Sequence, residues 1–134
     1  MVQDLALAED PSPWATEKWW GSRRLRYNVA LVIAGFLAFA CYAMVVDWCI
    51  RIEPSGDFEI TLFTTAFQAV GYLFMMAVAN VCYHLGPLSE RIVRPTHVAV
   101  YRTIAFRLGF WFSVLLPFAI PATLAISCHL HPGK

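Results

Sequence analysis

The sequence predicts an all-α membrane protein with three transmembrane helices in an up-down-up order, with the N-terminus inside and the C-terminus outside. Two observations carry this prediction. Of 134 residues, 59% are hydrophobic and only 14% are charged, which is too apolar for a soluble domain. Three long apolar stretches, at about 27–50, 60–85 and 104–128, each reach the roughly 20 residues that a helix needs to cross the hydrocarbon core.

The basic residues predict the orientation of these spans. Eight of them precede the first span or lie between and at the edges of the second and third: Lys18, Arg23, Arg24, Arg26, Arg91, Arg94, Arg102 and Arg107. The first connecting loop and the C-terminal tail carry one each, Arg51 and Lys134. Because basic residues are retained in the cytoplasm, this bias predicts a multi-pass protein of a bacterial inner membrane, N-in and C-out.

Residues 1–22 are predicted to form a mobile cytoplasmic tail, and residues 23–134 a single three-helix membrane domain. Pro11 and Pro13 should break any helix that the stretch 5–8 starts. Four aromatic residues then gather at the inner end of the first span: Trp14, Trp19, Trp20 and Tyr27. Aromatic side chains at this depth are typical interface anchors, which is the role expected of them here.

The two connecting loops carry turn signals. Pro54-Ser55-Gly56-Asp57 predicts a tight outer turn that makes the first two spans an antiparallel hairpin. Gly86-Pro87 is expected to end the second helix on the inner side. Beyond it, Arg91 and Arg94 are candidate contacts for anionic lipid or a cytoplasmic partner, although positive-inside topology alone also explains them.

Small residues form a narrow ridge on two of the spans. On the third span they recur at every fourth position: Ala105, Gly109, Ser113, Pro117, Pro121 and Ala125. The first span has a shorter series: Ala30, Ala34 and Ala38. Since small-xxx-small ridges permit close backbone approach in lipid, these residues predict that the first and third spans pack together. Pro117 and Pro121 also predict a kinked third helix, either as a fixed bend or as a hinge.

The outer ends of the first and third spans carry the most reactive side chains. Cys49 and Cys128 should lie at similar depth on the oxidising side, which makes them a candidate disulfide. Cys128, His129 and His131 are weaker candidates for a zinc or copper site, because no CxxC or HExxH spacing supports one.

His84 follows Tyr83 at the inner end of the second span and is a candidate for binding a cofactor. In size, span count and direction the chain resembles the small membrane anchors of succinate dehydrogenase, in which this region ligates haem. That family has a His-Arg-x-Ser-Gly-like stretch before the first span and a Gly-x-Arg-His sequence after the haem histidine. This chain has Arg23-Arg24-Leu25-Arg26-Tyr27-Asn28 and Leu85-Gly86-Pro87-Leu88 instead. The resemblance is therefore one of architecture.

No catalytic constellation or resident cofactor is predicted, because no nucleophile with a base, paired carboxylates or metal motif can be assembled from these residues. With 10 basic and 9 acidic residues, nucleic-acid binding is not expected either. The leading hypothesis is a non-catalytic membrane subunit that assembles with itself or with a larger membrane complex through its small-residue faces. The alternatives are an oligomeric pore, membrane-perturbing effector or immunity protein, and a haem- or quinone-carrying anchor.

Overall fold

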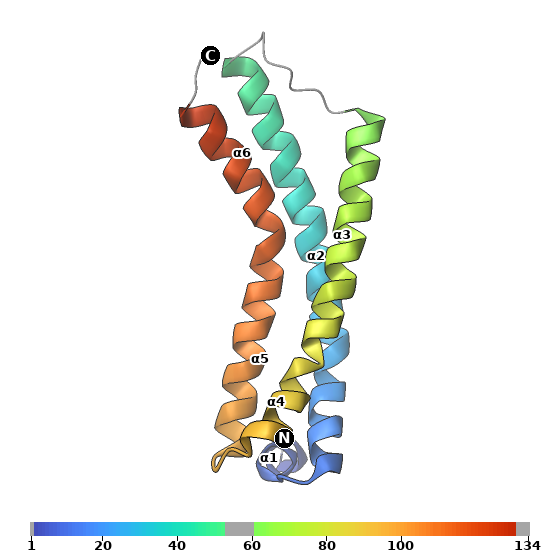
Figure 1. Cartoon of the computed structure of the whole chain (residues 1–134), viewed down its shortest axis with the longest axis vertical. Helices are drawn as coiled ribbons and strands as arrows, with labels where there is room; N and C mark the ends of the chain where they lie inside the picture. Colours follow the sequence, from blue (N-terminus) through green and yellow to red (C-terminus); the bar gives the residue numbers. More distant parts are fainter. Residues whose placement is uncertain (1, 53–60, 131–134) are drawn as a thin grey trace.

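The computed structural model describes residues 2–52 and 61–130, and these residues form an elongated helical bundle without strands (Figure 1). Three helical stretches, Pro13–Ile52, Leu62–Val93 and Val98–Leu130, are long and apolar enough to cross a membrane. The all-α class and the three predicted spans are therefore present. The predicted turn at residues 54–57 lies outside the described residues.

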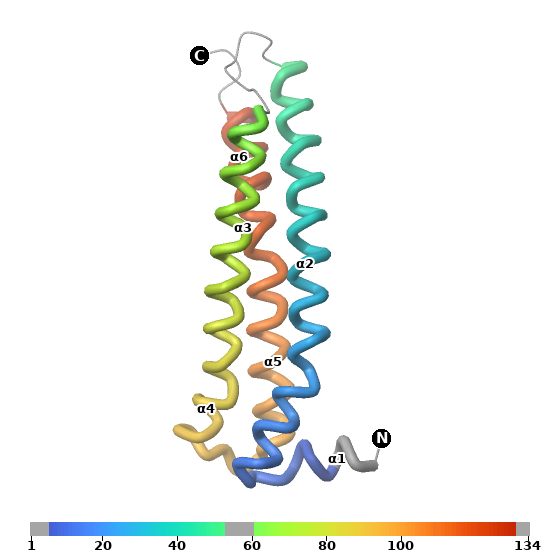
Figure 2. Tube along the Cα trace, turned by 90° about the vertical axis from the view of Figure 1, so that its right-hand side faces the viewer, coloured from blue at the N-terminus to red at the C-terminus, as the bar shows by residue number. Residues whose placement is uncertain are grey.

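The N-terminal segment differs from the predicted tail. Helix α1 (Val2–Glu9) lies across the base of the bundle, and helix α2 (Pro13–Ile52) then rises through its whole length (Figure 2). The predicted boundary at residue 22 falls inside α2. The prolines separate the two helices and do not abolish the first, because Pro13 is the first residue of α2, where a missing N–H has no intrahelical acceptor to lose.

The second span is helix α3 (Leu62–Tyr83), followed at once by the short helix α4 (Leu85–Val93). Thr61 and Thr64 form a capping box at the start of α3, each side chain accepting a hydrogen bond from the other's backbone N–H. Gly86-Pro87 does not end the helical stretch as predicted but lies in the first turn of α4, where a proline is tolerated. Arg94 ends α4 in the left-handed conformation, with φ of 48°.

The third span consists of helix α5 (Val98–Leu115), the 3₁₀ turn η1 (Leu116–Phe118) and helix α6 (Ala119–Leu130). Pro117 lies within the turn, where its missing N–H removes an α-helical hydrogen bond. Pro121 lies near the start of α6. Regular α-helix is therefore interrupted at Pro117, one of the two prolines at which the sequence predicts a kink.

Helices α2, α5 and α6 pack along their lengths, whereas α3 is splayed from them. A continuous stripe of α2 is buried: Tyr27, Leu31, Ala34, Gly35, Ala38, Val46 and Cys49. On the third span Ser113, Pro117 and Pro121 are buried. Helix α3 buries only Tyr83, at the end that meets α4, which is the inner end in the predicted orientation.

The small-residue ridges contribute to this packing unevenly. Ala34, Ala38 and Ser113 are buried, while Ala30 and Ala105 are partly exposed. Gly109 departs from the predicted ridge, because it is exposed and a Cβ added there would meet nothing within 4 Å. The close approach of the first and third spans therefore depends on the residues that follow Gly109, among which Ser113, Pro117 and Pro121 are buried.

Candidate functional site

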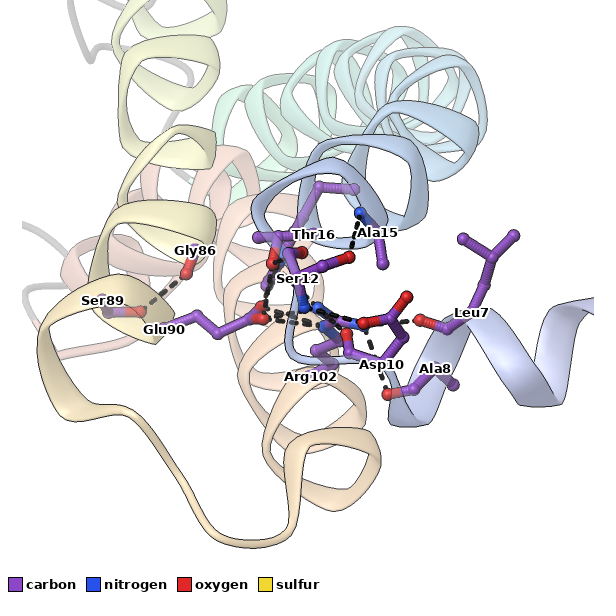
Figure 3. A network of polar contacts seen from close by, with 11 residues as sticks. Leu7, Ala8, Asp10, Ser12, Ala15, Thr16, Gly86, Ser89, Glu90 and Arg102 are labelled. Atoms are coloured by element: carbon purple, nitrogen blue, oxygen red, sulfur yellow. Dashed lines mark hydrogen bonds and ion pairs between the residues drawn. The ribbon is translucent and has the colours of Figure 1, made fainter.

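The inner end of the bundle is organised around a buried ion pair between Glu90 of α4 and Arg102 of α5 (Figure 3). Arg102 is fully buried and Glu90 is 5% exposed. Arg102 Nη2 lies 2.5 Å from Glu90 Oε1, and Arg102 Nε donates to both carboxylate oxygens at 3.0 Å. Thr16 of α2 donates from Oγ1 to the same Oε1 at 2.8 Å. One carboxylate thus joins α2, α4 and α5.

Arg102 also holds the N-terminal segment. Its Nη1 donates to the carbonyl oxygens of Leu7 and Ala8 at 2.6 and 3.2 Å, and its Nη2 donates to that of Asp10 at 3.1 Å. These carbonyls lie at the C-terminal end of α1, where intrahelical donors are missing and a positive charge is favoured. Arg102 therefore caps α1 and fixes it across the base of the bundle.

An aromatic cluster lies directly above this ion pair. Trp20 Nε1 donates to Glu90 Oε2 at 3.1 Å, and the Tyr83 hydroxyl donates to the Trp20 carbonyl at 2.6 Å. The Tyr27 hydroxyl is 2.8 Å from Ser113 Oγ and 3.1 Å from the Ala79 carbonyl oxygen. The cluster thus joins the three spans by hydrogen bonds to backbone carbonyls as well as by ring contacts.

The predicted interface anchoring of these aromatic residues is wrong for three of the four. Trp19, Trp20 and Tyr27 are 3–4% exposed and form the core of the bundle. The rings of Trp19 and Trp20 pack edge to face with centroids 5.1 Å apart, a favoured arrangement of two indoles. Only Trp14, with 63% of its surface exposed, lies at the periphery as expected.

Two glycines let α3 and α4 approach α2. A Cβ at Gly86 would lie 2.5 Å from the Trp20 indole, so only glycine fits beside that ring. A Cβ at Gly35 would overlap the ring of Tyr72, whose hydroxyl donates to the Leu31 carbonyl. Between Tyr72 and the start of α3 at Leu62, no side-chain hydrogen bond joins α3 to another helix within the described residues.

The outer end is organised differently, by a single covalent link. Cys49 of α2 and Cys128 of α6 form a disulfide with an S–S distance of 2.05 Å, which brings together the two cysteines singled out in the sequence. Asp47 and Arg51 form an exposed ion pair at 2.7 Å nearby. Because the Cys128 sulfur is bonded to Cys49, it has no thiolate to offer a metal, and the weak metal hypothesis fails on this residue.

The remaining predicted residues do not gather at one site. His129 is exposed at the end of α6, and His131 lies outside the described residues. His84 is exposed at the junction of α3 and α4. Arg91 forms an ion pair with Glu17 at 2.7 Å, with both side chains more than half exposed. Arg94 is exposed.

The arrangement has the properties of a structural joint. All polar atoms of the Glu90 carboxylate and the Arg102 guanidinium are directed at protein groups, so neither is available to a substrate. Glu90 and Arg102 carried no signal of pairing in the sequence beyond their opposite charges on either side of a short loop. Comparison with protein-family models, curated proteins and solved structures found no match to this chain.

Proposed function

We propose that this protein is a small non-catalytic membrane subunit that assembles with itself or with a larger membrane complex, and that helix α3 is the face through which it assembles. The small residues on which the sequence-based hypothesis relied are largely used within the chain, since Ala34, Ala38 and Ser113 are buried between α2 and α5. Helix α3 fully buries only Tyr83 and leaves a face of large apolar side chains exposed, among them Phe67, Val70 and Phe74.

The observation that carries this proposal is Gln68. It lies on α3 about 9 Å from Leu62, at a rise of about 1.5 Å per residue, which places its amide inside the apolar part of the span. Among the described residues its side chain has no hydrogen-bond partner. An amide at membrane depth favours a partner on another helix, because lipid offers none. A second chain docked on α3 supplies that partner.

The orientation forms part of the same proposal. The end with the Glu90–Arg102 pair faces the cytoplasm of a bacterial inner membrane, and the Cys49–Cys128 end faces an oxidising compartment, where disulfides persist. In this orientation Arg94 lies at the level of the inner headgroups and contacts anionic lipid. The third span bends at the Leu116–Phe118 turn as part of its fixed packing.

The test is the native mass of the protein extracted gently from its own membrane, measured for the parent and for Gln68→Leu. We expect the parent to be part of a larger assembly and Gln68→Leu to yield a smaller one. Asn80→Leu is the matched control, because the Asn80 amide already donates to the Met76 carbonyl of its own helix at 3.0 Å. A monomeric parent without partners, or equal masses for parent and Gln68→Leu, would contradict the proposal.

The same preparation tests the cofactor alternative. Haem bound at His84 would give a visible absorption band that disappears in His84→Ala. Such a band would mean that the protein is a cofactor-carrying anchor and not a purely structural subunit.

A further inference from the structure

A cavity of about 110 Å³ lies between α2, the junction of α3 and α4, and α5. Its inner wall is made of buried aromatic residues of the cluster described above, Trp20, Tyr27 and Tyr83. Gly109 of α5 also lines the cavity, and a Cβ added there would meet nothing within 4 Å. The position that leaves the small-residue ridge therefore lines a cavity instead.

The cavity opens sideways between two membrane-spanning helices. Three of its lining residues are exposed and form the mouth: Cys82 on α3 and Gly109 and Phe112 on α5. Next to them in the chain, Val81 and Leu108 expose 69% and 68% of their surface. Lipid covers such apolar surface in a membrane, so the mouth faces hydrocarbon and not water.

The wall of the cavity favours an apolar occupant. Its hydroxyl groups are already bonded, because Tyr27 pairs with Ser113 and with the Ala79 carbonyl, and Tyr83 donates to the Trp20 carbonyl. Apolar cavities stay free of water and accept hydrocarbon, and one of about 150 Å³ binds benzene. A cavity of this size holds a group of a few carbon atoms and excludes a whole porphyrin.

We propose that the end of a lipid acyl chain occupies this cavity, entering from the bilayer between Cys82 and Gly109 and packing against Trp20. The chain is recognised as unbranched hydrocarbon, with no contribution from a headgroup. This inference requires only that the spans lie in a membrane, so it holds whether or not α3 binds a partner.

The first test compares lipid retention by the parent protein with retention by a variant whose cavity mouth is filled. Native mass spectrometry of the detergent-extracted protein should show one lipid held per chain and loss of that lipid in Gly109→Phe, whose ring fills the mouth. Gly71→Phe is the matched control, because Gly71 is also an exposed helix glycine with nothing within 4 Å of an added Cβ, yet it does not line the cavity. Equal lipid retention in Gly109→Phe and the parent would overturn the proposal.

The second test locates the chain beside Trp20. In a protein that keeps Trp20 alone, with phenylalanine replacing the other tryptophans, phospholipids brominated on the acyl chain should quench its fluorescence. Trp20 is 4% exposed, so bromine reaches it only through the cavity. Gly109→Phe should abolish most of this quenching and Gly71→Phe should leave it. Absence of quenching in the parent, as expected if a partner's side chain fills the space, would overturn the proposal.

Discussion

The first and third spans are joined to each other at both ends, whereas the second span is joined to them only from Tyr72, at its middle, to its inner end within the described residues. At the inner end, Glu90 and Arg102 connect all three spans and α1. At the outer end, the Cys49–Cys128 disulfide connects α2 with α6 and leaves α3 out. The buried small residues follow the same division, since Ala34 and Ala38 lie on α2 and Ser113 on α5, and no residue of α3 except Tyr83 is buried.

The two ends of the bundle are stabilised by interactions that differ in kind. At the end of the bundle that carries α1, a buried ion pair is stabilised because every donor and acceptor around Arg102 is paired. Between helices in lipid, burial of apolar surface gives little driving force, so a span stays attached through packing, hydrogen bonds or a covalent link. Helix α3 has these only near Tyr72 and Tyr83.

The largest loss of stability is expected from breaking the inner joint, the Glu90–Arg102 ion pair with its hydrogen bonds to α1 and α2. Arg102→Met leaves the Glu90 carboxylate buried without its partner and releases the carbonyls at the end of α1. Removing one member of a buried pair costs about 3–5 kcal/mol. We therefore expect the free energy of unfolding in bicelles to fall by about that amount.

The control for this variant is Arg91→Met, which removes an ion pair of similar length, 2.7 Å, between exposed side chains. Exposed pairs contribute about 0–1 kcal/mol, so this variant should stay close to the parent. Similar losses in the two variants would mean that the buried network has no special role.

The next effect concerns the outer link between the first and third spans. Cys49→Ser removes a disulfide that closes a loop with a sequence separation of 79 residues. A loss of about 2–4 kcal/mol is expected, because a disulfide restricts the unfolded chain. Unfolding under nonreducing conditions measures it, with Cys41→Ser as the control since Cys41 is a free cysteine. In electrophoresis, the mobility of the parent should differ between reducing and nonreducing conditions, and that of Cys49→Ser should not. An unchanged mobility of the parent would mean that the Cys49–Cys128 disulfide does not form.

A smaller effect is expected where α3 is attached. Tyr83→Phe removes the hydrogen bond from its hydroxyl to the Trp20 carbonyl, 2.6 Å long, and keeps the ring. Interhelical hydrogen bonds in membranes contribute about 1 kcal/mol, so the free energy of unfolding should fall by that amount. Tyr42→Phe serves as the comparison, since Tyr42 has no side-chain hydrogen bond within the described part of the chain. Equal effects of the two changes would argue against this attachment.

The sequence was sufficient for the helical class and for the three spans, because long apolar runs have few other solutions in a chain of this composition. It also singled out Cys49 and Cys128, since two helix ends on the same side of a membrane are at similar depth. Both inferences depend on position along the membrane normal, which a hydropathy pattern records directly.

The inner joint could not be predicted in this way. Arg102 was interpreted only as a positive charge that orients the spans, and Trp19 and Trp20 as interface anchors. Their roles depend on which faces of α2, α4 and α5 meet, and on α1 folding back so that its carbonyls reach Arg102. Such lateral contacts leave no period or spacing in a single sequence. The same reason explains why Gly109 was placed in a packed ridge when it lines a cavity.

Distances within one chain, measured at the two ends of the bundle, report how firmly each pair of helices is held together. Spin labels can be attached to exposed positions once Cys41 and Cys82, the two free cysteines, are replaced by alanine. The Cys49–Cys128 disulfide stays intact in this background. Labels are then placed in pairs at the inner and outer ends of the protein reconstituted as a monomer.

The decisive measurement is the width of the distance distributions for three such pairs, by pulsed electron paramagnetic resonance. Leu25 with Val81 reports the inner ends of α2 and α3, Met44 with Ile126 the outer ends of α2 and α6, and Met44 with Phe67 the outer ends of α2 and α3. We expect narrow distributions for the first two pairs and a broad one for the third. An equally narrow distribution for Met44 with Phe67 would contradict the claim that the second span is held only from Tyr72 to its inner end.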